Sequence, residues 1–255
     1  MWYKNMEKKN FEIGTVLFSK KNRPNFKKRK DEEMEFIVAV DGPAGSGKGT
    51  ITKMVGEKEN LVYIDTGALY RCVTLSMLRK NIGLEDLEKI QEILNTIDIE
   101  FKKQGDEKKV YLNGEDVSLE IRESAVNKLV SPASHLVIVR EAITDLSRKI
   151  AKGKEVIMEG RDIGTNVFPN ADVKIYLDAT PEERARRRQK QNEEKGINIP
   201  FEEIVENIKF RDNNDKTSPV APLKQAEDAI YIDSSNMTIE EVVNKVIEII
   251  NQNRR

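Results

Sequence analysis

Short apolar runs alternate with longer amphipathic segments from about residue 35 onward. The runs, each bounded by glycine or aspartate, are Phe36–Val40, Leu61–Ile64, Val156–Met158, Val173–Leu177 and Ala229–Ile232. Continuous apolar strands separated by helices indicate a parallel sheet that is covered on both faces. The pattern therefore predicts an α/β fold with a five-stranded parallel sheet flanked by helices.

Two helix starts can be read directly. Thr180-Pro181-Glu182-Glu183 and Thr238-Ile239-Glu240-Glu241 both match a capping box, and the first has proline at the first helical position. The final helix is predicted to bury an apolar stripe made of Val242, Val243, Val246, Ile249 and Ile250.

One segment interrupts the alternation. Ile97–Phe101 and Val110–Leu112 are short strand candidates, and Asn113-Gly114 is a strong hairpin signal. We expect a small antiparallel insertion over about 97–135 that includes a helix from about Leu119 to Val130. Insertions at the strand ends of such sheets commonly build a second substrate's site, and purely structural decoration is the alternative.

Composition restricts the classes of function. Charged residues make up 34% of the 255 residues, yet the net charge is only −1, so a uniformly basic surface for nucleic acid is not indicated. A single cysteine, Cys72, excludes an internal disulfide, and it has no standard zinc spacing to the single histidine, His135. No apolar run approaches about 18 residues, so we expect no membrane span. These features predict a cytoplasmic protein, and we expect a monomer.

Residues 1–33 differ from the rest of the chain. Before Asp31, ten lysines and arginines accompany only Glu7 and Glu12. We expect a disordered basic extension, separate from a domain at 34–255. Binding of nucleic acid or another anionic surface is the alternative, and Met34 leaves open a start site at that residue.

The strongest chemical signal follows the first apolar run. The stretch Asp41–Thr50, DGPAGSGKGT, is a glycine-rich turn between a predicted strand and a predicted helix, as in a phosphate-binding loop (P-loop). Glycines let successive N–H groups point at an anion, the helix N-terminus adds partial positive charge, and Lys48 adds a full charge. Gly49 stands where serine or threonine is usual, with Thr50 one residue further on. A surface turn that binds nothing is the alternative, which the lysine, the spacing and the strand disfavour.

Arginines and carboxylates follow the other predicted strands. Asp65–Arg71 comes after the second strand and Glu159–Thr165 after the third, while Arg140 begins a predicted helix that ends at Ala151. Arg211 and Asp215 lie four residues apart on one helical face. Because strand ends face the ligand crevice of an open parallel sheet, several arginines there indicate more than one bound phosphate. A surface ion pair is the alternative for any one arginine.

Arg184, Arg187 and Arg188 share one face of the predicted helix Glu182–Lys195. They fit a short helical lid, at about 182–196, that closes over phosphates and excludes water. The spacing of Glu182 with Arg186 is also that of ordinary ion pairs, so a solvated helix remains open.

Taken together, these motifs resemble the bacterial cytidylate kinases from about residue 35 to the C-terminus. The motifs are Asp41–Thr50, Asp65–Arg71, Val139–Ala142, Gly160–Thr165 and Arg211-Asp212-x-x-Asp215. The Gly-Lys-Gly-Thr ending is typical of nucleoside monophosphate kinases in general. The Gly-Arg-Asp-Ile-Gly-Thr stretch and the insertion are typical of the bacterial cytidylate type, in which the insertion binds the nucleoside monophosphate.

The resemblance implies transfer of the γ-phosphoryl group of ATP to CMP or dCMP, with Mg²⁺ held mainly by phosphates and water and by no protein ligand. It implies an ATP-binding loop of Gly42, Pro43, Ala44, Gly45, Ser46, Gly47, Lys48, Gly49 and Thr50. It also implies CMP binding by Thr66, Arg71, Ser131, Arg140, Arg161, Asp162, Arg211 and Asp215. The implied catalytic residues are Lys48, Arg71, Arg161 and the lid arginines Arg184, Arg187 and Arg188.

Within the implied acceptor site, Arg71 and Arg161 hold the phosphate, and Arg211 and Asp215 approach the pentose. Ser131, Arg140 and Asp162 read the cytosine. A carboxylate such as Asp162 can accept a hydrogen bond from the cytosine N4 amino group, whereas uracil presents an acceptor oxygen there.

The acceptor is already a phosphate oxyanion at neutral pH, so the reaction needs alignment and charge neutralisation but no general base. Arginine suits this work through its bidentate geometry and permanent charge. One departure is Ser218, which stands where the family often carries an arginine, with Lys216 as a compensating charge.

Two other functions stay open from the sequence. The first is a kinase of the same fold that acts on another small acceptor. The second is a nucleotide-regulated protein whose basic extension binds nucleic acid with strong salt sensitivity. The sequence contains no Asn-Lys-x-Asp guanine-reading motif, which disfavours a GTPase-type switch.

Overall fold

The computed structural model describes residues 36–104, 107–194 and 196–254. The basic extension predicted at 1–33 lies outside the described residues. None of the helices in the described parts of the chain combines the length and the apolarity needed to cross a bilayer.

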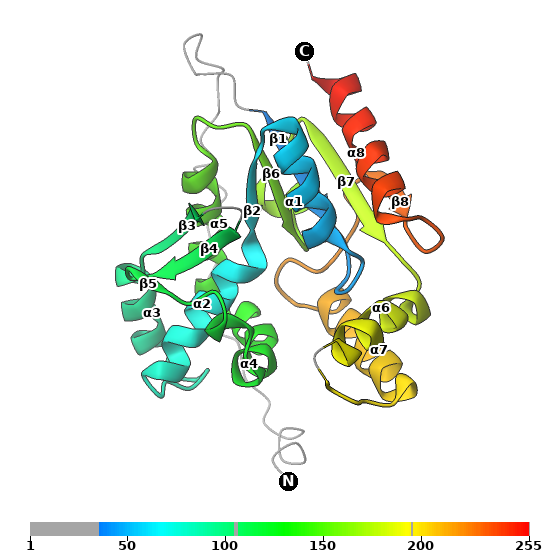
Figure 1. The fold of residues 1–255 in the computed structure, drawn as a ribbon. Coiled ribbons are helices and arrows are strands. Elements are labelled where there is room, and N and C mark those ends of the chain that lie inside the picture. The colour runs from blue at the N-terminus through cyan, green and yellow to red at the C-terminus, as the bar shows by residue number, and fades with distance from the viewer. Residues whose placement is uncertain (1–35, 105–106, 195, 255) are drawn as a thin grey trace. The chain divides into compact units, whose positions relative to one another are not determined.

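Five parallel strands form the central sheet in the order β2-β6-β1-β7-β8 (Figure 1). They are β1 (Ile37–Asp41), β2 (Val62–Asp65), β6 (Val156–Gly160), β7 (Val173–Asp178) and β8 (Ile230–Asp233). Each of the five predicted apolar runs is therefore a strand, which confirms the predicted α/β class. Asp41 pairs in register with Gly160 on one side and Tyr176 on the other. The glycine-rich loop consequently leaves the middle of the sheet at its carboxyl edge.

Helices cover both faces of this sheet. On one face, α1 (Lys48–Glu59) and α8 (Ile239–Asn253) bury their apolar sides against β1, β7 and β8. On the other face lie the end of α5 (Val137–Ala151) and a π-helical turn at Ile163–Val167. The predicted apolar stripe of α8 is buried, and both predicted capping threonines accept a backbone hydrogen bond. Arg140 lies one turn inside α5, because that helix begins three residues earlier than the sequence pattern suggested.

A second core forms beside the sheet, around α2 (Thr66–Arg79) and α3 (Leu87–Thr96). The predicted antiparallel insertion is present as β3 (Ile99–Gln104), β4 (Glu107–Leu112) and β5 (Glu115–Asp116). Asn113 and Gly114 both have positive φ and make the tight turn between β4 and β5.

The prediction of one helix from about Leu119 to Val130 is wrong in its start and end. A short 3₁₀ turn covers Glu120–Arg122, and the helix α4 (Ser124–Ser134) follows. Glu123 separates them with extended backbone, at φ −65° and ψ 158°. An extended residue ends the run of helical hydrogen bonds, which periodicity alone does not reveal.

The last pair of helices is α6 (Pro181–Glu193) and α7 (Phe201–Lys216), which share a small core of Ala185, Ile204 and Ile208. Figure 1 shows α2 and α4 on one side of the carboxyl edge of the sheet and α6 and α7 on the other. The segments that follow β1, β2 and β6 line a cavity between these two groups.

Candidate active site

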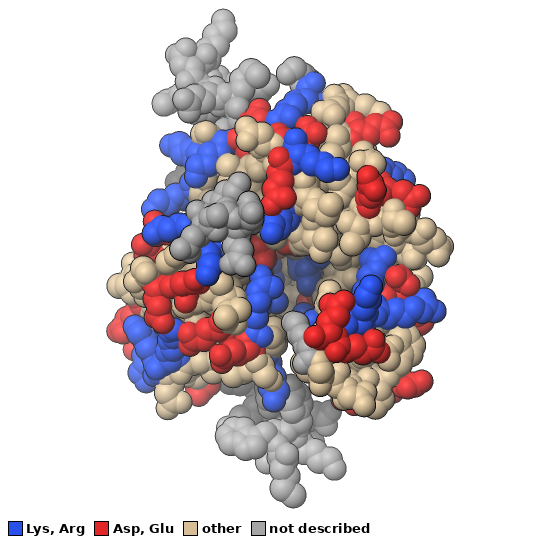
Figure 2. Space-filling view, in the orientation of Figure 1, with Lys and Arg blue, Asp and Glu red and all other residues tan. Residues whose placement is uncertain are grey.

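A cavity of about 840 Å³ lies at the carboxyl edge of the sheet, between the two groups of helices. Figure 2 shows the hollow there, with basic and acidic side chains on both sides. Seven arginines line it, namely Arg71, Arg122, Arg140, Arg161, Arg187, Arg188 and Arg211. The sequence had singled out all of these except Arg122. Such a concentration of guanidinium groups suits a ligand with several phosphates.

The glycine-rich loop forms one wall of this cavity from Ala44 to Thr50. Gly42 has a φ of 150°, and a Cβ atom there would lie 2.0 Å from the carbonyl oxygen of Leu177 on the neighbouring strand. Gly45 and Gly47 have φ of 82° and 93°, in the region that favours glycine. The glycines are therefore required by the path of the loop, which curls its N–H groups toward the start of α1.

Lys48 is the central cation of the loop and is 5% exposed. Its Nζ donates hydrogen bonds to the carbonyl oxygens of Gly42, at 2.7 Å, and Pro43, at 2.8 Å. Burial, followed by the positive charge of Arg161, lowers the pKa of Lys48 to about 7. A bound polyphosphate would reverse that shift, because negative charge nearby favours the ammonium form.

Glu159 is a buried carboxylate that the sequence analysis did not assign to the site. It lines the cavity from β6, and its Oε1 accepts a hydrogen bond from the hydroxyl of Tyr63. Burial, with the nearby charge of Asp65, raises the pKa of Glu159 to about 7. A Cβ atom on Gly49 would lie 3.0 Å from Oε1 of Glu159. Gly49 thus leaves room for this carboxylate at the position where P-loops usually carry a hydroxyl side chain.

The available signal for Glu159 was a charged residue inside an otherwise apolar strand. Charged residues are rarely fully buried unless they have partners, so a glutamate in a central strand indicates a specific role.

Arg140 and Asp162 form a buried ion pair, with Nη1 2.8 Å from Oδ1. Arg140 comes from α5 and Asp162 from the loop after β6, so the pair joins two walls of the cavity. The Arg140 guanidinium also lies over the ring of Tyr70, at 5.2 Å from its centroid. Ser131, on α4, also lines the cavity. The three residues that were expected to read the base therefore line one cavity, and their roles stay a prediction.

Arg161 reaches across the cavity to α7, where its Nε lies 2.8 Å from Oδ2 of Asp215. Arg71 and Arg211 line the cavity nearby, and Thr66 donates its hydroxyl to the carbonyl oxygen of Glu159 at 2.7 Å. Burial lowers the pKa of Arg71, while the charge of Asp65 opposes that shift. These groups gather positive charge within reach of one another without any bound anion.

The three expected lid arginines have different surroundings. Arg187 and Arg188 line the cavity, and Arg187 donates to the Ser46 carbonyl oxygen at 3.2 Å and to the Ser234 carbonyl oxygen at 2.7 Å. Arg184 is 2% exposed and lies outside the cavity lining.

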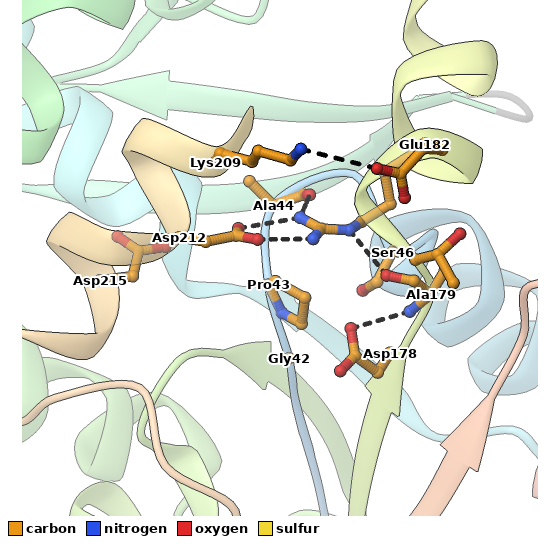
Figure 3. A network of polar contacts seen from close by, with 12 residues as sticks. Gly42, Pro43, Ala44, Ser46, Asp178, Ala179, Glu182, Lys209, Asp212 and Asp215 are labelled. Atoms are coloured by element: carbon orange, nitrogen blue, oxygen red, sulfur yellow. Dashed lines mark hydrogen bonds and ion pairs between the residues drawn. The ribbon is translucent and has the colours of Figure 1, made fainter. Parts of the chain in front are cut away.

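The Arg184 guanidinium contacts Asp212 on α7 through both of its terminal nitrogens, at 2.8 and 2.5 Å (Figure 3). It also donates to the carbonyl oxygens of Ala179, at 2.9 Å, and Ala44, at 3.1 Å. In this structure Arg184 joins the glycine-rich loop to α7 and does not line the cavity, and its role as a lid arginine stays a prediction. Helical spacing indicated that Arg184, Arg187 and Arg188 share one face of α6. It could not show that α7 packs against the Arg184 end of that face.

Two further positions bear on the acceptor side. Ser218 lines the cavity, but its hydroxyl donates to the carbonyl oxygen of Val220 at 2.7 Å, and Lys216 is exposed outside the lining. His135 lines the cavity near Asp215, and partial burial, with the charge of Arg140, lowers its pKa.

A glycine-rich phosphate loop and an arginine-lined cavity at the carboxyl edge of a parallel sheet define a P-loop kinase. The model of the cytidylate kinase family matches residues 38–252. The cytidylate kinase of Fusobacterium nucleatum is 50% identical over 208 residues, covering 82% of this chain and 94% of that protein. The Bacillus subtilis cytidylate kinase is 43% identical over 223 residues, covering 88% of this chain and 100% of that protein. The chain belongs to the cytidylate kinase family.

Proposed function

We propose that this chain transfers the γ-phosphoryl group of ATP to CMP or dCMP, giving ADP and CDP or dCDP. The observation that carries the proposal is the single cavity that contains both the phosphate loop and the Arg140–Asp162 pair. One end of the cavity suits a polyphosphate, and the other combines arginines with a base-reading carboxylate. Two nucleotides that share one cavity can meet with their phosphates facing each other.

In the proposed reaction, an oxygen of the acceptor phosphate attacks the γ-phosphorus while the bond from that phosphorus to the β–γ bridging oxygen breaks. ADP leaves with the bond's electron pair, and no proton has to move because the acceptor is an oxyanion. The protein's contribution is alignment and neutralisation of negative charge. Lys48 exchanges its contacts with the Gly42 and Pro43 carbonyl oxygens for contacts with the donor phosphates.

The acceptor half of the cavity orients CMP. Arg71 and Arg161 hold its phosphate, and Asp215 orients the Arg161 guanidinium through the 2.8 Å contact. Arg211 and Asp215 face the pentose. Asp162 accepts a hydrogen bond from the N4 amino group of cytosine, with Arg140 and Ser131 beside it.

Mg²⁺, when bound with the donor, would offset negative charge on the transferred group. The oxygen donors of this site suit that ion, because Mg²⁺ prefers carboxylates, hydroxyls and water. The Glu159 carboxylate, beside Gly49, and the Thr50 hydroxyl would hold it or its water ligands. This assigns more to the protein than the sequence analysis did.

The proposal is tested by a coupled assay of ADP release with ATP and Mg²⁺ on CMP, dCMP, UMP and AMP. CMP and dCMP should react much faster than UMP and AMP. Faster reaction of another acceptor would favour a kinase of the same fold with a different substrate. Nucleotide-dependent binding of nucleic acid without phosphoryl transfer would favour the alternative of a nucleotide-regulated protein that binds nucleic acid.

Arg71→Ala gives a second test with a matched control. It should raise the KM for CMP at least tenfold, because a charge-assisted phosphate contact is lost, and leave the KM for ATP within about twofold. Arg79→Ala, on the same helix but paired with Glu115 and Glu120 outside the cavity, should change neither. An equal rise in the KM for CMP and the KM for ATP in Arg71→Ala would contradict the assignment of Arg71 to the acceptor phosphate.

A further inference from the structure

A second cavity of about 590 Å³ adjoins the main one and shares Arg140 and Ala221 with it. Arg140 lines both cavities, whereas Asp162 lines only the main cavity. The second cavity is bounded by α5, by residues 220–222 and by the π-helical turn, including Thr165 and Asn166. The face of the Arg140–Asp162 pair turned away from the main cavity is therefore open to protein side chains that a bound nucleotide would not contact.

Asn166 contacts Asp162 from the side of the second cavity. Its Nδ2 donates to Oδ2 of Asp162 at 3.0 Å, while Arg140 donates to Oδ1 at 2.8 Å. Each oxygen of this carboxylate thus receives one hydrogen bond from the protein.

The π-helical turn puts the Asn166 side chain in that position. The backbone N–H groups of Asn166 and Val167 both donate to the carbonyl oxygen of Asp162, at 2.9 and 3.1 Å. Asp41, at the end of β1, accepts from the N–H groups of Ile163, at 2.8 Å, and Gly164, at 2.7 Å. The turn is held at its start by the central strand and closed on Asp162 itself, which fixes the direction of the carboxylate.

This arrangement bears on the choice between cytosine and uracil. Cytosine offers an N4 amino donor, whereas uracil offers an O4 acceptor at the same place. The Asp162 carboxylate can accept from the cytosine N4 amino group but has no hydrogen to donate to the uracil O4. Because Asn166 and Arg140 each occupy one of its oxygens, they fix the directions of the remaining lone pairs toward the base.

We propose that Asn166 is a positioning residue that sets the preference for cytosine over uracil by holding the Asp162 carboxylate in the orientation that accepts from the cytosine amino group. The inference rests on the proposed function, because it requires Asp162 to face the base of the acceptor nucleotide. Asn166 is exposed on the side away from the main cavity, so its effect reaches the substrate through Asp162.

The test compares kcat/KM for CMP and UMP in the full chain and in three variants. Asn166→Ala should lower the CMP-to-UMP ratio roughly threefold to tenfold, the size expected for one hydrogen bond, through a higher KM for CMP. Asn166→Asp has the same shape but replaces the donor with a second carboxylate beside Asp162, so its ratio should fall further. Thr165→Ala, in the same turn and cavity lining, should keep the wild-type ratio.

The kcat with saturating CMP, the KM for ATP and the Tm should stay close to wild type in Asn166→Ala. If Asn166 had a purely structural role, Asn166→Ala would instead lower Tm and raise the KM for both CMP and ATP, and this result would overturn the inference. A wild-type ratio in both Asn166 variants, with the wild-type enzyme active on CMP, would also overturn it and leave the proposed function standing. Failure of the proposed function would be visible first, as wild-type protein that does not phosphorylate CMP.

Discussion

Removing the Arg184 guanidinium should destabilise the whole fold. Arg184 and Asp212 form a bidentate pair whose side chains are only 3% and 13% exposed. The same guanidinium satisfies the carbonyl oxygens of Ala179, at the end of β7, and Ala44, in the phosphate loop. Arg184→Met keeps much of the aliphatic volume but leaves Asp212 as an unpaired carboxylate under α6.

The magnitude follows from this environment. Breaking a buried ion pair by removing one partner costs about 3–5 kcal/mol, which is a large share of the roughly 5–15 kcal/mol that stabilises a typical protein. For a chain of this size, a loss of 1 kcal/mol lowers Tm by about 2–4 °C, so we expect a decrease of roughly 6–20 °C. The double variant Arg184→Met, Asp212→Leu should recover part of this loss, because no buried charge then remains.

Urea unfolding of the wild type, the two single variants and the double variant gives the coupling free energy of the pair. Arg186→Met is the matched control, because Arg186 lies on the same helix with a 66% exposed side chain. Its free energy of unfolding should stay within about 0.5 kcal/mol of wild type. An Arg184→Met protein of unchanged stability but with a greatly reduced kcat would refute this reasoning and return Arg184 to the phosphates.

Two further predictions concern the buried carboxylates. Glu159→Gln should raise the Mg²⁺ concentration for half-maximal activity about tenfold, because it removes an oxygen that holds the ion or one of its water ligands. Glu155→Gln, on a side chain 45% exposed, should leave that concentration unchanged, and equal Mg²⁺ dependence in both variants would contradict the metal assignment. Burial raises the pKa of Asp41 from 3.8 to about 6, so the folded protein binds its proton more tightly than the unfolded chain. The free energy of unfolding should therefore fall by about 3 kcal/mol on this account as pH rises from about 3 to 7, most steeply between the two pKa values. In urea titrations at several pH values, the free energy of unfolding of Asp41→Asn should fall less with rising pH than that of the wild type. The same pH dependence in both proteins would contradict the assignment to Asp41.

Much of the fold was predictable because its signals are local. Each apolar run became a strand, since a strand buried on both faces needs continuous apolar residues. Gly45 and Gly47 act through the φ of their own backbone, and the capping threonines act on the N–H group three residues further on. Where a local signal was missing, as at the extended residue Glu123, the predicted helix was wrong.

The candidate site was predictable as a set of residue types but not as a set of partners. Strand order places the 160–165 loop beside Asp41 and Asp65 beside Glu159, so their convergence at one edge followed from the rule for open parallel sheets. That Gly49 leaves room for Glu159 depends on how the start of α1 packs beside β6, about 110 positions away in the sequence, which no local pattern encodes.

The sequence by itself determined the parallel sheet, the phosphate loop and the arginine-rich carboxyl edge. Only the tertiary structure decided which charged side chains form pairs with each other. Arg184 and Arg187 share a helical face, yet Arg184 lies under α7 against Asp212 and Arg187 lies at the cavity. Asn166 carried no motif and became informative only because the turn closes it onto Asp162. Periodicity fixes the direction of a side chain on its own element, whereas its electrostatic role depends on which distant element packs against it.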